Sequence, residues 1–307
     1  MTRAVVFAYH NVGVRCLSVL LAHGVEVARV VTHRDNPAET IWFDSVAGLA
    51  RLNDLTVVTP DDPNTSAVMA EIEAARPDFI FSFYYRHMIS TTLLDLAPRG
   101  AYNMHGSLLP RYRGRAPVNW VIIHGERETG ATLHRMVEKP DAGEIVAQQA
   151  VPILPDDSAR DVFDKVTFAA ELALDRVLPA LLAGTAPHVP QDLSRGSYFG
   201  GRQPEDGRID WTRSARTIHD LVRAVAPPYP GARFEFKGLR SRLLRTQVSP
   251  TVGPPGAQAE LLREGGRLLA HCTDGSVLRL IHFECDGIDL DAVSFTQRFG
   301  HGPHVLS

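Results

Sequence analysis

The feature that most constrains this chain is the alternation of short apolar runs with helical segments over its first two thirds. The runs at 4–8, 26–32 and 79–84 are rich in the valine and aromatic residues that favour strands. Segments predicted to be helical, such as 66–75, lie between them. Strands that alternate with helices predict βαβ units and a mostly parallel, Rossmann-like sheet. Because ligands bind beyond the carboxyl ends of such strands, side chains that directly follow the runs are the first candidates for function.

The pattern changes in the last third of the chain. A long helix predicted from residue 157 to about 184 is followed by 185–204, a stretch rich in proline and glycine that we interpret as a linker. After a further predicted helix come five short strand-like runs separated by turns, at 232–237, 241–247, 259–263, 267–272 and 277–283. This pattern predicts a small, OB-like β-barrel. We therefore expect an α/β domain over 1–203 and a β-barrel domain over 204–307.

Composition and charge exclude several classes of protein. The 307 residues are 44% hydrophobic and 22% charged, which is typical of globular proteins. The net charge is −3, and residues 204–307 hold 13 Lys and Arg against 12 Asp and Glu, so a nucleic-acid partner is not expected. No apolar stretch is long enough for a signal peptide or a membrane span. Three isolated cysteines fit a reducing compartment, so we expect a cytoplasmic protein.

Two bound groups are also not expected. The first predicted βα turn, at 9–13, lacks the glycine-rich fingerprint of dinucleotide-binding folds, so we expect no NAD. His301 and His304 are close in sequence, but no carboxylate or cysteine accompanies them, so we expect no metal site.

The strongest candidates for chemistry are Asn103, His105 and Asp141. Asn103 and His105 are two residues apart at the end of a predicted strand, so both side chains project from one face of the sheet. A carboxamide beside an imidazole offers two donors for a developing oxyanion. Asp141 lies in a turn after another predicted strand, where a carboxylate could orient the imidazole. Each motif alone is common in proteins, and only their combination points to function.

That combination resembles a known signature. Asn103-x-His105-Gly-Ser-Leu-Leu-Pro, then Arg113-Gly, then Asp141-x-Gly143 is similar to the pattern of the 10-formyltetrahydrofolate-dependent formyltransferases. That family includes methionyl-tRNA formyltransferase and the amino-sugar N-formyltransferases. The resemblance implies that Asn103 stabilises a tetrahedral intermediate, that His105 is the acid and base, and that Asp141 favours the protonated histidine.

The resemblance also implies a site for 10-formyltetrahydrofolate without a metal. The residues that it assigns to this co-substrate follow predicted strands: His87, Met88, Ile89, Arg115, Val137, Glu138, Lys139, Pro140 and Asp141.

Further stretches, at 5–10, 81–87, 132–136 and 222–226, are similar to ArnA-type formyltransferase domains. Those domains formylate UDP-4-amino-4-deoxy-L-arabinose in lipid A modification, which confers polymyxin resistance. The resemblance implies this nucleotide-linked amino sugar as the acceptor. Tyr9, His10, Tyr84 and Arg86 follow predicted strands and are the candidate substrate residues.

Several alternatives stay open. The decarboxylase half of those relatives does not follow in this sequence, which leaves the acceptor uncertain. Another amino sugar or hydroxyornithine is an alternative acceptor. Methionyl-tRNA formyltransferase is disfavoured by the charge balance of 204–307, and a non-catalytic folate- or nucleotide-sugar-binding module by the complete catalytic trio.

Overall fold

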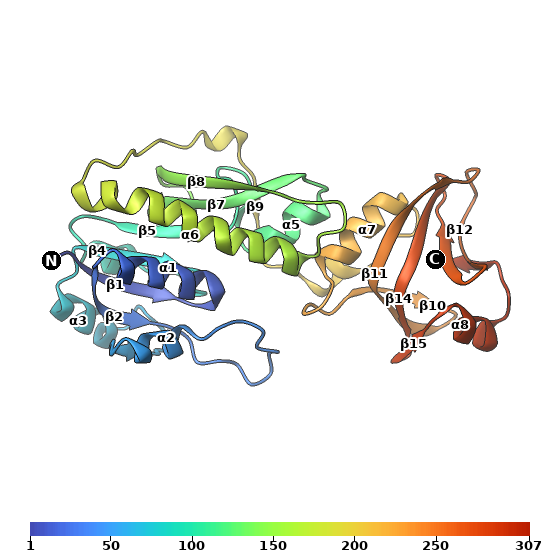
Figure 1. Cartoon of the computed structure of the whole chain (residues 1–307), viewed down its shortest axis with the longest axis horizontal. Helices are drawn as coiled ribbons and strands as arrows, with labels where there is room; N and C mark the ends of the chain where they lie inside the picture. The colour runs from blue at the N-terminus through green and yellow to red at the C-terminus, as the bar shows by residue number, and fades with distance from the viewer. The chain divides into compact units, whose positions relative to one another are not determined.

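The computed structural model describes residues 1–307 and divides into two compact units (Figure 1). The N-terminal unit contains residues 1–117, 128–152 and 164–200, and the C-terminal unit contains 118–127, 153–163 and 201–307. The candidate catalytic residues all belong to the N-terminal unit.

The N-terminal unit is built on one seven-stranded sheet with the order β3-β2-β1-β4-β5-β7-β8. The first five strands are parallel, while β7 and β8 are antiparallel to their neighbours. This arrangement confirms the predicted Rossmann-like α/β fold. The strands are β1 (Arg3–Ala8), β2 (Glu26–Val31), β3 (Val57–Val58), β4 (Phe79–Phe83), β5 (Ala101–His105), β7 (Glu128–Arg135) and β8 (Ile145–Pro152).

The centre of this sheet is apolar on both faces. All five residues of β4 are buried, and so are the last five residues of β1. Strands covered on both sides lack the alternation of polar and apolar residues, which is why the sequence shows continuous apolar runs. The helices of this part of the chain are α1 (His10–Ala22), α2 (Val46–Leu52), α3 (Ser66–Ala75), α4 (Thr91–Leu94), α5 (Pro117–Ile123) and α6 (Ala159–Ala183).

The antiparallel pairing of β5 with β7 determines what lies around the candidate catalytic residues. Asn103 is directly opposite His134, and His105 is directly opposite Thr132. Directly opposite residues in an antiparallel pair project to the same face. Strand β7 therefore supplies one neighbour for each of the two residues.

The segment 185–204, predicted to be a linker, has structure of its own. It contains a 3₁₀ turn, η1 (Leu193–Arg195), and β9 (Tyr198–Phe199), and η2 (Pro204–Gly207) begins at its end. Strand β9 pairs in parallel with β6 (Arg113–Gly114), and the Ser197 hydroxyl accepts a hydrogen bond from the backbone N–H of Tyr112 at 2.8 Å. The linker interpretation was wrong for 191–199 because its contacts are to distant residues, which local composition does not reveal.

The C-terminal unit is an antiparallel half-barrel with the strand order β10-β11-β14-β13-β12-β16, and β15 also pairs with β14. Residues 249–252 belong to the end of the long strand β11. The elements are α7 (Ala215–Ala224), β10 (Ala232–Phe236), β11 (Leu239–Val252), β12 (Ala259–Glu264), β13 (Arg267–His271), β14 (Ser276–Cys285), β15 (Ile288–Leu290), α8 (Ala292–Phe299) and β16 (His304–Leu306).

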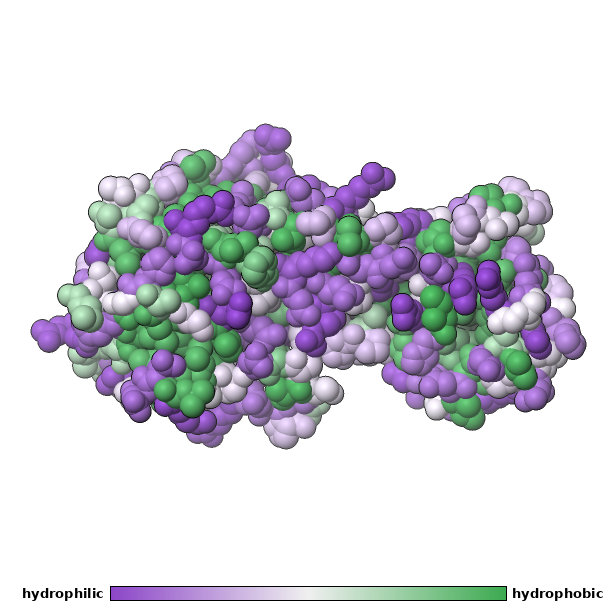
Figure 2. Space-filling view, viewed as in Figure 1, coloured by the Kyte–Doolittle hydropathy of each residue, from purple (hydrophilic) through white to green (hydrophobic).

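Figure 2 shows hydrophilic and hydrophobic residues interspersed on the face of each unit drawn there, which is ordinary for a folded protein. No helix combines the length and the apolar composition needed to cross a membrane. No group of three or more His, Cys, Asp or Glu side chains is arranged to hold a metal ion. All three cysteines are free and buried.

Candidate active site

Asn103 and His105 lie at the carboxyl end of β5, as the sequence predicts. The Asn103 side chain is partly exposed, whereas His105 is only 6% exposed. The next residue, Gly106, has no room for a side chain, because a Cβ there would lie 1.8 Å from the Tyr84 hydroxyl oxygen. Tyr84, one of the candidate substrate residues, therefore packs directly against the end of the catalytic strand.

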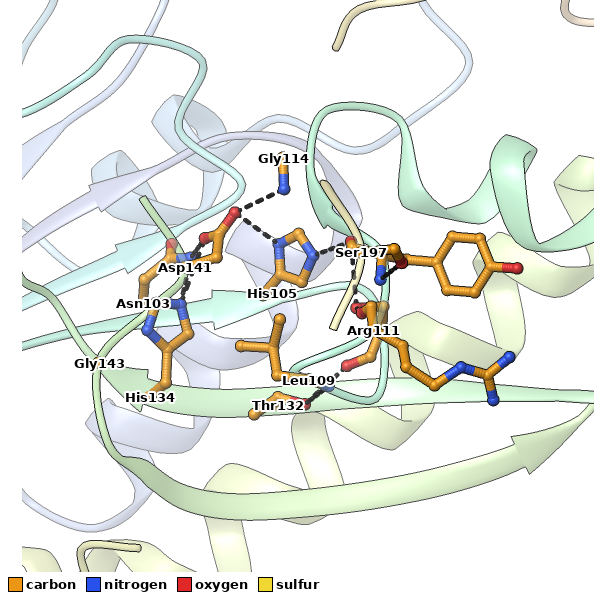
Figure 3. A network of polar contacts seen from close by, with 12 residues as sticks. Asn103, His105, Leu109, Arg111, Gly114, Thr132, His134, Asp141, Gly143 and Ser197 are labelled. Atoms are coloured by element: carbon orange, nitrogen blue, oxygen red, sulfur yellow. Dashed lines mark hydrogen bonds and ion pairs between the residues drawn. The ribbon is translucent and has the colours of Figure 1, made fainter. Parts of the chain in front are cut away.

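Asp141 connects the candidate catalytic residues into one network (Figure 3). One carboxylate oxygen, Oδ2, accepts a hydrogen bond from the Gly114 N–H at 2.9 Å and lies 3.6 Å from His105 Nδ1. The other, Oδ1, lies 3.4 Å from His134 Nε2 and 3.5 Å from Asn103 Nδ2. We call this group the Asp141 network; its members are Asn103, His105, Gly114, His134 and Asp141.

The Asp141 network keeps its carboxylate ionised. Burial acts to raise the pKa of Asp141, but the charge of His105, the hydrogen bond and charge of His134 and the Gly114 N–H outweigh it, so the pKa lies well below its usual range. A carboxylate that stays ionised throughout the neutral pH range gives His105 and His134 a constant negative neighbour.

The two ring nitrogens of His105 have different partners. Nε2 lies 2.8 Å from the Tyr112 carbonyl oxygen, which can only accept, so Nε2 carries a proton. Nδ1 faces Asp141 at the longer distance of 3.6 Å, an ion pair when the ring is doubly protonated. Figure 3 shows the ring between Asp141 and the loop that carries Arg111. Nε2 is therefore committed to the backbone, and Nδ1 is the ring nitrogen that faces the carboxylate.

The turn that carries Asp141 is held from two sides. Asp141 has a left-handed backbone, with φ of 52°, and Gly143 approaches β7 so closely that a Cβ would lie 1.9 Å from the Arg135 carbonyl oxygen. The Gln191 side-chain amide donates to the carbonyl oxygens of Asp141 at 3.0 Å and of Gly143 at 2.6 Å. A left-handed backbone at a non-glycine residue is costly, and these bonds over-determine it.

The residues that the resemblance assigns to the folate lie in the loop after β4, directly after β6 and in the loop after β7. Met88 is 64% exposed and Val137 is 43% exposed, so each loop presents an apolar side chain to solvent. Ile89 is buried in the hydrophobic core, so it contributes backbone groups and not its side chain to any surface. The Arg115 guanidinium donates to the carbonyl oxygen of Arg86 at 3.3 Å. His87, Glu138 and Lys139 are exposed, and Pro140 is partly exposed.

The other three candidate substrate residues join a separate group at the ends of β1, β2 and β4, which we call the His33 cluster. Its members are Tyr9, His10, His33, Phe43, Tyr85 and Arg86. The His33 ring stacks on Tyr85 with centroids 4.2 Å apart, and its Nε2 accepts a hydrogen bond from the Arg86 N–H at 3.0 Å. Arg86 also lies over the Tyr9 ring and forms a bidentate pair with Glu39.

Burial shapes the titration of the His33 cluster. Burial, and then the nearby His87 and Arg86, lowers the pKa of His33 to about 4, so the ring is neutral at physiological pH. Burial and a hydrogen bond to Asp35 raise the pKa of Tyr9 to about 12. The Tyr9 hydroxyl is thus a donor to a carboxylate and not a group that ionises.

Sequence reasoning missed His134, Thr132 and Gln191. Thr132 donates to the Ser107 carbonyl oxygen at 2.6 Å and accepts from the Leu109 N–H at 3.2 Å, so it fixes the loop after His105. His134 and Thr132 alternate along one strand, and this spacing could have placed both on the face of Asn103 and His105. Nothing in the local sequence signals Gln191.

Comparison with known proteins identifies the family. The model of the formyl transferase family matches residues 15–178, and the model of the formyl transferase C-terminal domain matches residues 202–300. The chain belongs to the formyl transferase family. It is accordingly an enzyme of the formyltransferase class, as the Asn103, His105 and Asp141 motif predicts.

Solved structures share the fold of this formyltransferase. The sugar 3-N-formyltransferase WlaRD, solved with dTDP and 5-N-formyl-THF, is 18% identical with a TM-score of 0.72, over 91% of this chain and 97% of that one. An N-formyltransferase from Helicobacter canadensis, in complex with folinic acid and dTDP-3-aminofucose, is 18% identical with a TM-score of 0.71, over 91% and 99%.

A third structure, HypX from Aquifex aeolicus with tetrahydrofolic acid, is 20% identical with a TM-score of 0.63, over 97% of this chain and 47% of that one. At these identities the likeness shows a common fold.

Proposed function

We propose that this formyltransferase moves a formyl group from 10-formyltetrahydrofolate to the amine of a nucleotide-linked amino sugar, with UDP-4-amino-4-deoxy-L-arabinose as the first acceptor to test. The observation that carries the proposal is the Asp141 network, in which a carboxamide, an imidazole and an ionised carboxylate meet at the carboxyl end of β5. Hydrogen-bond donors held in place before reaction are what acyl transfer to an amine requires.

In the proposed reaction, the residues of this chain have distinct roles. Bound 10-formyltetrahydrofolate supplies the electrophilic formyl carbon. Asn103 Nδ2 and His105 Nδ1 donate to the formyl oxygen as negative charge develops on it. The bond from the acceptor nitrogen to the carbon forms and the bond from the carbon to the donor nitrogen breaks. One proton leaves the acceptor amine and one reaches the departing nitrogen. His105 transfers this proton from the first nitrogen to the second.

Two of the segments assigned to the folate, after β4 and after β7, expose apolar side chains that support the assignment. Met88 and Val137 expose apolar side chains that a flat aromatic ring would cover, and burying them removes apolar area from water. WlaRD and HypX, which share the fold, were solved with reduced folates.

Two observations support the proposed identity of the acceptor. WlaRD is a sugar N-formyltransferase, and the N-formyltransferase from Helicobacter canadensis was solved with dTDP-3-aminofucose. The sequence resemblance points further, to the ArnA-type domains and hence to lipid A modification and polymyxin resistance. We expect the enzyme to work in the cytoplasm, because its three buried cysteines are free thiols that suit a reducing compartment.

The test is a turnover assay with 10-formyltetrahydrofolate and UDP-4-amino-4-deoxy-L-arabinose. Tetrahydrofolate release and a product heavier by one formyl group are the expected results. The same assay with dTDP-3-aminofucose, N5-hydroxyornithine and methionyl-tRNA distinguishes the alternative acceptors.

The outcomes separate chemistry from specificity. Faster turnover of another acceptor would replace the sugar and keep the reaction. Folate binding without turnover of any amine would favour a non-catalytic binding module. Absence of folate binding would contradict the proposed co-substrate.

A further inference from the structure

His134 is buried beside the candidate catalytic residues, and neither the family resemblance nor the comparisons give it a role. It is 2% exposed and lies on β7, directly opposite Asn103 on β5. Its Nε2 is 3.1 Å from Asn103 Nδ2, a shorter contact than the 3.5 Å between Asn103 Nδ2 and Asp141 Oδ1. A buried imidazole with both nitrogens in contact with polar atoms is a connected part of the site.

The backbone fixes which nitrogen of His134 carries a proton. Nδ1 lies 2.9 Å from the Arg135 carbonyl oxygen, which has no hydrogen to give, so Nδ1 is the donor. In the neutral ring Nε2 then has a lone pair and accepts from the nearest donor, the Asn103 amide nitrogen. Only the protonated ring donates from Nε2 to Asp141 Oδ1, 3.4 Å away, and lowers the pKa of that carboxyl.

This chain of donors fixes the orientation of the Asn103 carboxamide. Its nitrogen points toward His134 and Asp141, so its oxygen points the other way. His134 Nε2 and Asp141 Oδ1 are only 3.4 Å apart, so both lie on one side of the amide nitrogen and share one of its hydrogens. The second hydrogen stays available for a developing oxyanion. If the carboxamide turned over, its oxygen would face that negative charge and repel it.

We infer that His134 is a positioning residue for formyl transfer, which holds the Asn103 carboxamide with its N–H₂ group toward the reacting oxygen. The inference rests on the proposed function, since it concerns the oxyanion that Asn103 stabilises. His134 itself does not touch the substrate, because its ring is buried and both nitrogens already have partners.

The kinetic test compares His134→Leu with His134→Gln. Leucine offers no acceptor, and we expect kcat to fall roughly 10- to 100-fold, less than for loss of Asn103 itself, with KM for the folate unchanged. The glutamine side chain places a carbonyl oxygen near the position of Nε2, so His134→Gln should recover most of kcat. In an Asn103→Ala background, His134→Leu should cause no further loss. A role in packing alone predicts the same loss in both backgrounds.

Three outcomes would overturn the inference: an unchanged kcat in His134→Leu, an equal loss in His134→Gln, or additive losses with Asn103→Ala. If the leucine variant does not fold, the inference can still be tested on the unmodified protein. NMR of ¹⁵N-labelled protein should show a coupling between Asn103 Nδ2 and His134 Nε2 across their hydrogen bond, and absence of that coupling would refute the orientation. This measurement needs no acceptor, so it stands even if the proposed sugar is wrong.

Discussion

The Asp141 network and the His33 cluster lie at the same edge of one sheet, yet they are held by different interactions. In the Asp141 network, hydrogen bonds from backbone and buried side chains fix each group, such as the Gly114 N–H on the carboxylate. In the His33 cluster, stacked rings and partly exposed ion pairs such as Arg86 with Glu39 predominate. Directional bonds fix single atoms, as chemistry requires, whereas stacked rings tolerate small shifts. This difference is consistent with the proposed roles, in which the first region performs the reaction and the second binds the acceptor.

The largest effect should come from Asp141→Asn. The substitution keeps the size of the side chain but removes the charge that faces both histidines, so kcat should fall about 10²- to 10⁴-fold. Because the pKa of Asp141 is held below its usual range, the carboxylate is charged throughout neutral pH, and its loss should also displace the pH–rate profile. A superimposable profile would show that the charge does not act on the histidines. Circular dichroism of the variant controls for folding.

Asn103→Ala should have the next largest effect. It removes one oxyanion donor, for which a loss of roughly 100- to 1,000-fold in kcat is expected, while the fold is retained. Single-turnover kinetics with saturating folate measure this step. Near-normal turnover by a folded variant would remove Asn103 from the mechanism and weaken the contrast between the two regions.

Arg86→Gln tests the His33 cluster and should act on binding. The Arg86–Glu39 pair is partly exposed, so its loss should change stability by less than about 1 kcal/mol. If Arg86 contacts the acceptor, KM for the acceptor should rise about 10-fold with kcat retained, the signature of lost ground-state binding. Arg86→Lys, which keeps the charge, is the matched control. An unchanged KM would separate Arg86 from the substrate.

The smallest effect should be that of His33→Phe on acid stability. The folded pKa of His33, about 4, is below the ordinary value of 6.5, so the unfolded chain takes up the proton first. His33 therefore supports the fold above pH 6.5, and this support is lost as the pH falls toward 4. Phenylalanine keeps the stacking but cannot titrate, so the decrease in melting temperature between pH 7 and pH 4.5 should shrink by about 2–4 °C. An equal decrease in both proteins would mean that His33 is not the acid-sensitive group.

Much of this structure could be predicted from the sequence. Most of the features that could not be predicted depend on contacts between residues far apart in the chain. Asn103 and His105 could be placed because two-residue spacing at a strand end needs only local geometry. Five of the C-terminal strands could be predicted because turns separate them, whereas β15 and β16, of three residues each, were missed. His134 required the register of β5 against β7, and Gln191 required a contact across 50 residues of chain. The local periodicity of the sequence does not reveal such long-range pairings.

Gln191 and Ser197 set the limits of any autonomous catalytic fragment. Both residues come after the end of α6, and both hold the chain around the site, at Asp141 and at Tyr112. The N-terminal family match ends earlier, at residue 178.

A fragment cut at residue 178 would keep the three signature residues in its sequence but lose the chain that braces two of the loops around them. Folding of the sheet would then be a poor guide to activity. The shortest fragment worth expressing extends through Phe199, where β9 completes its pairing with β6.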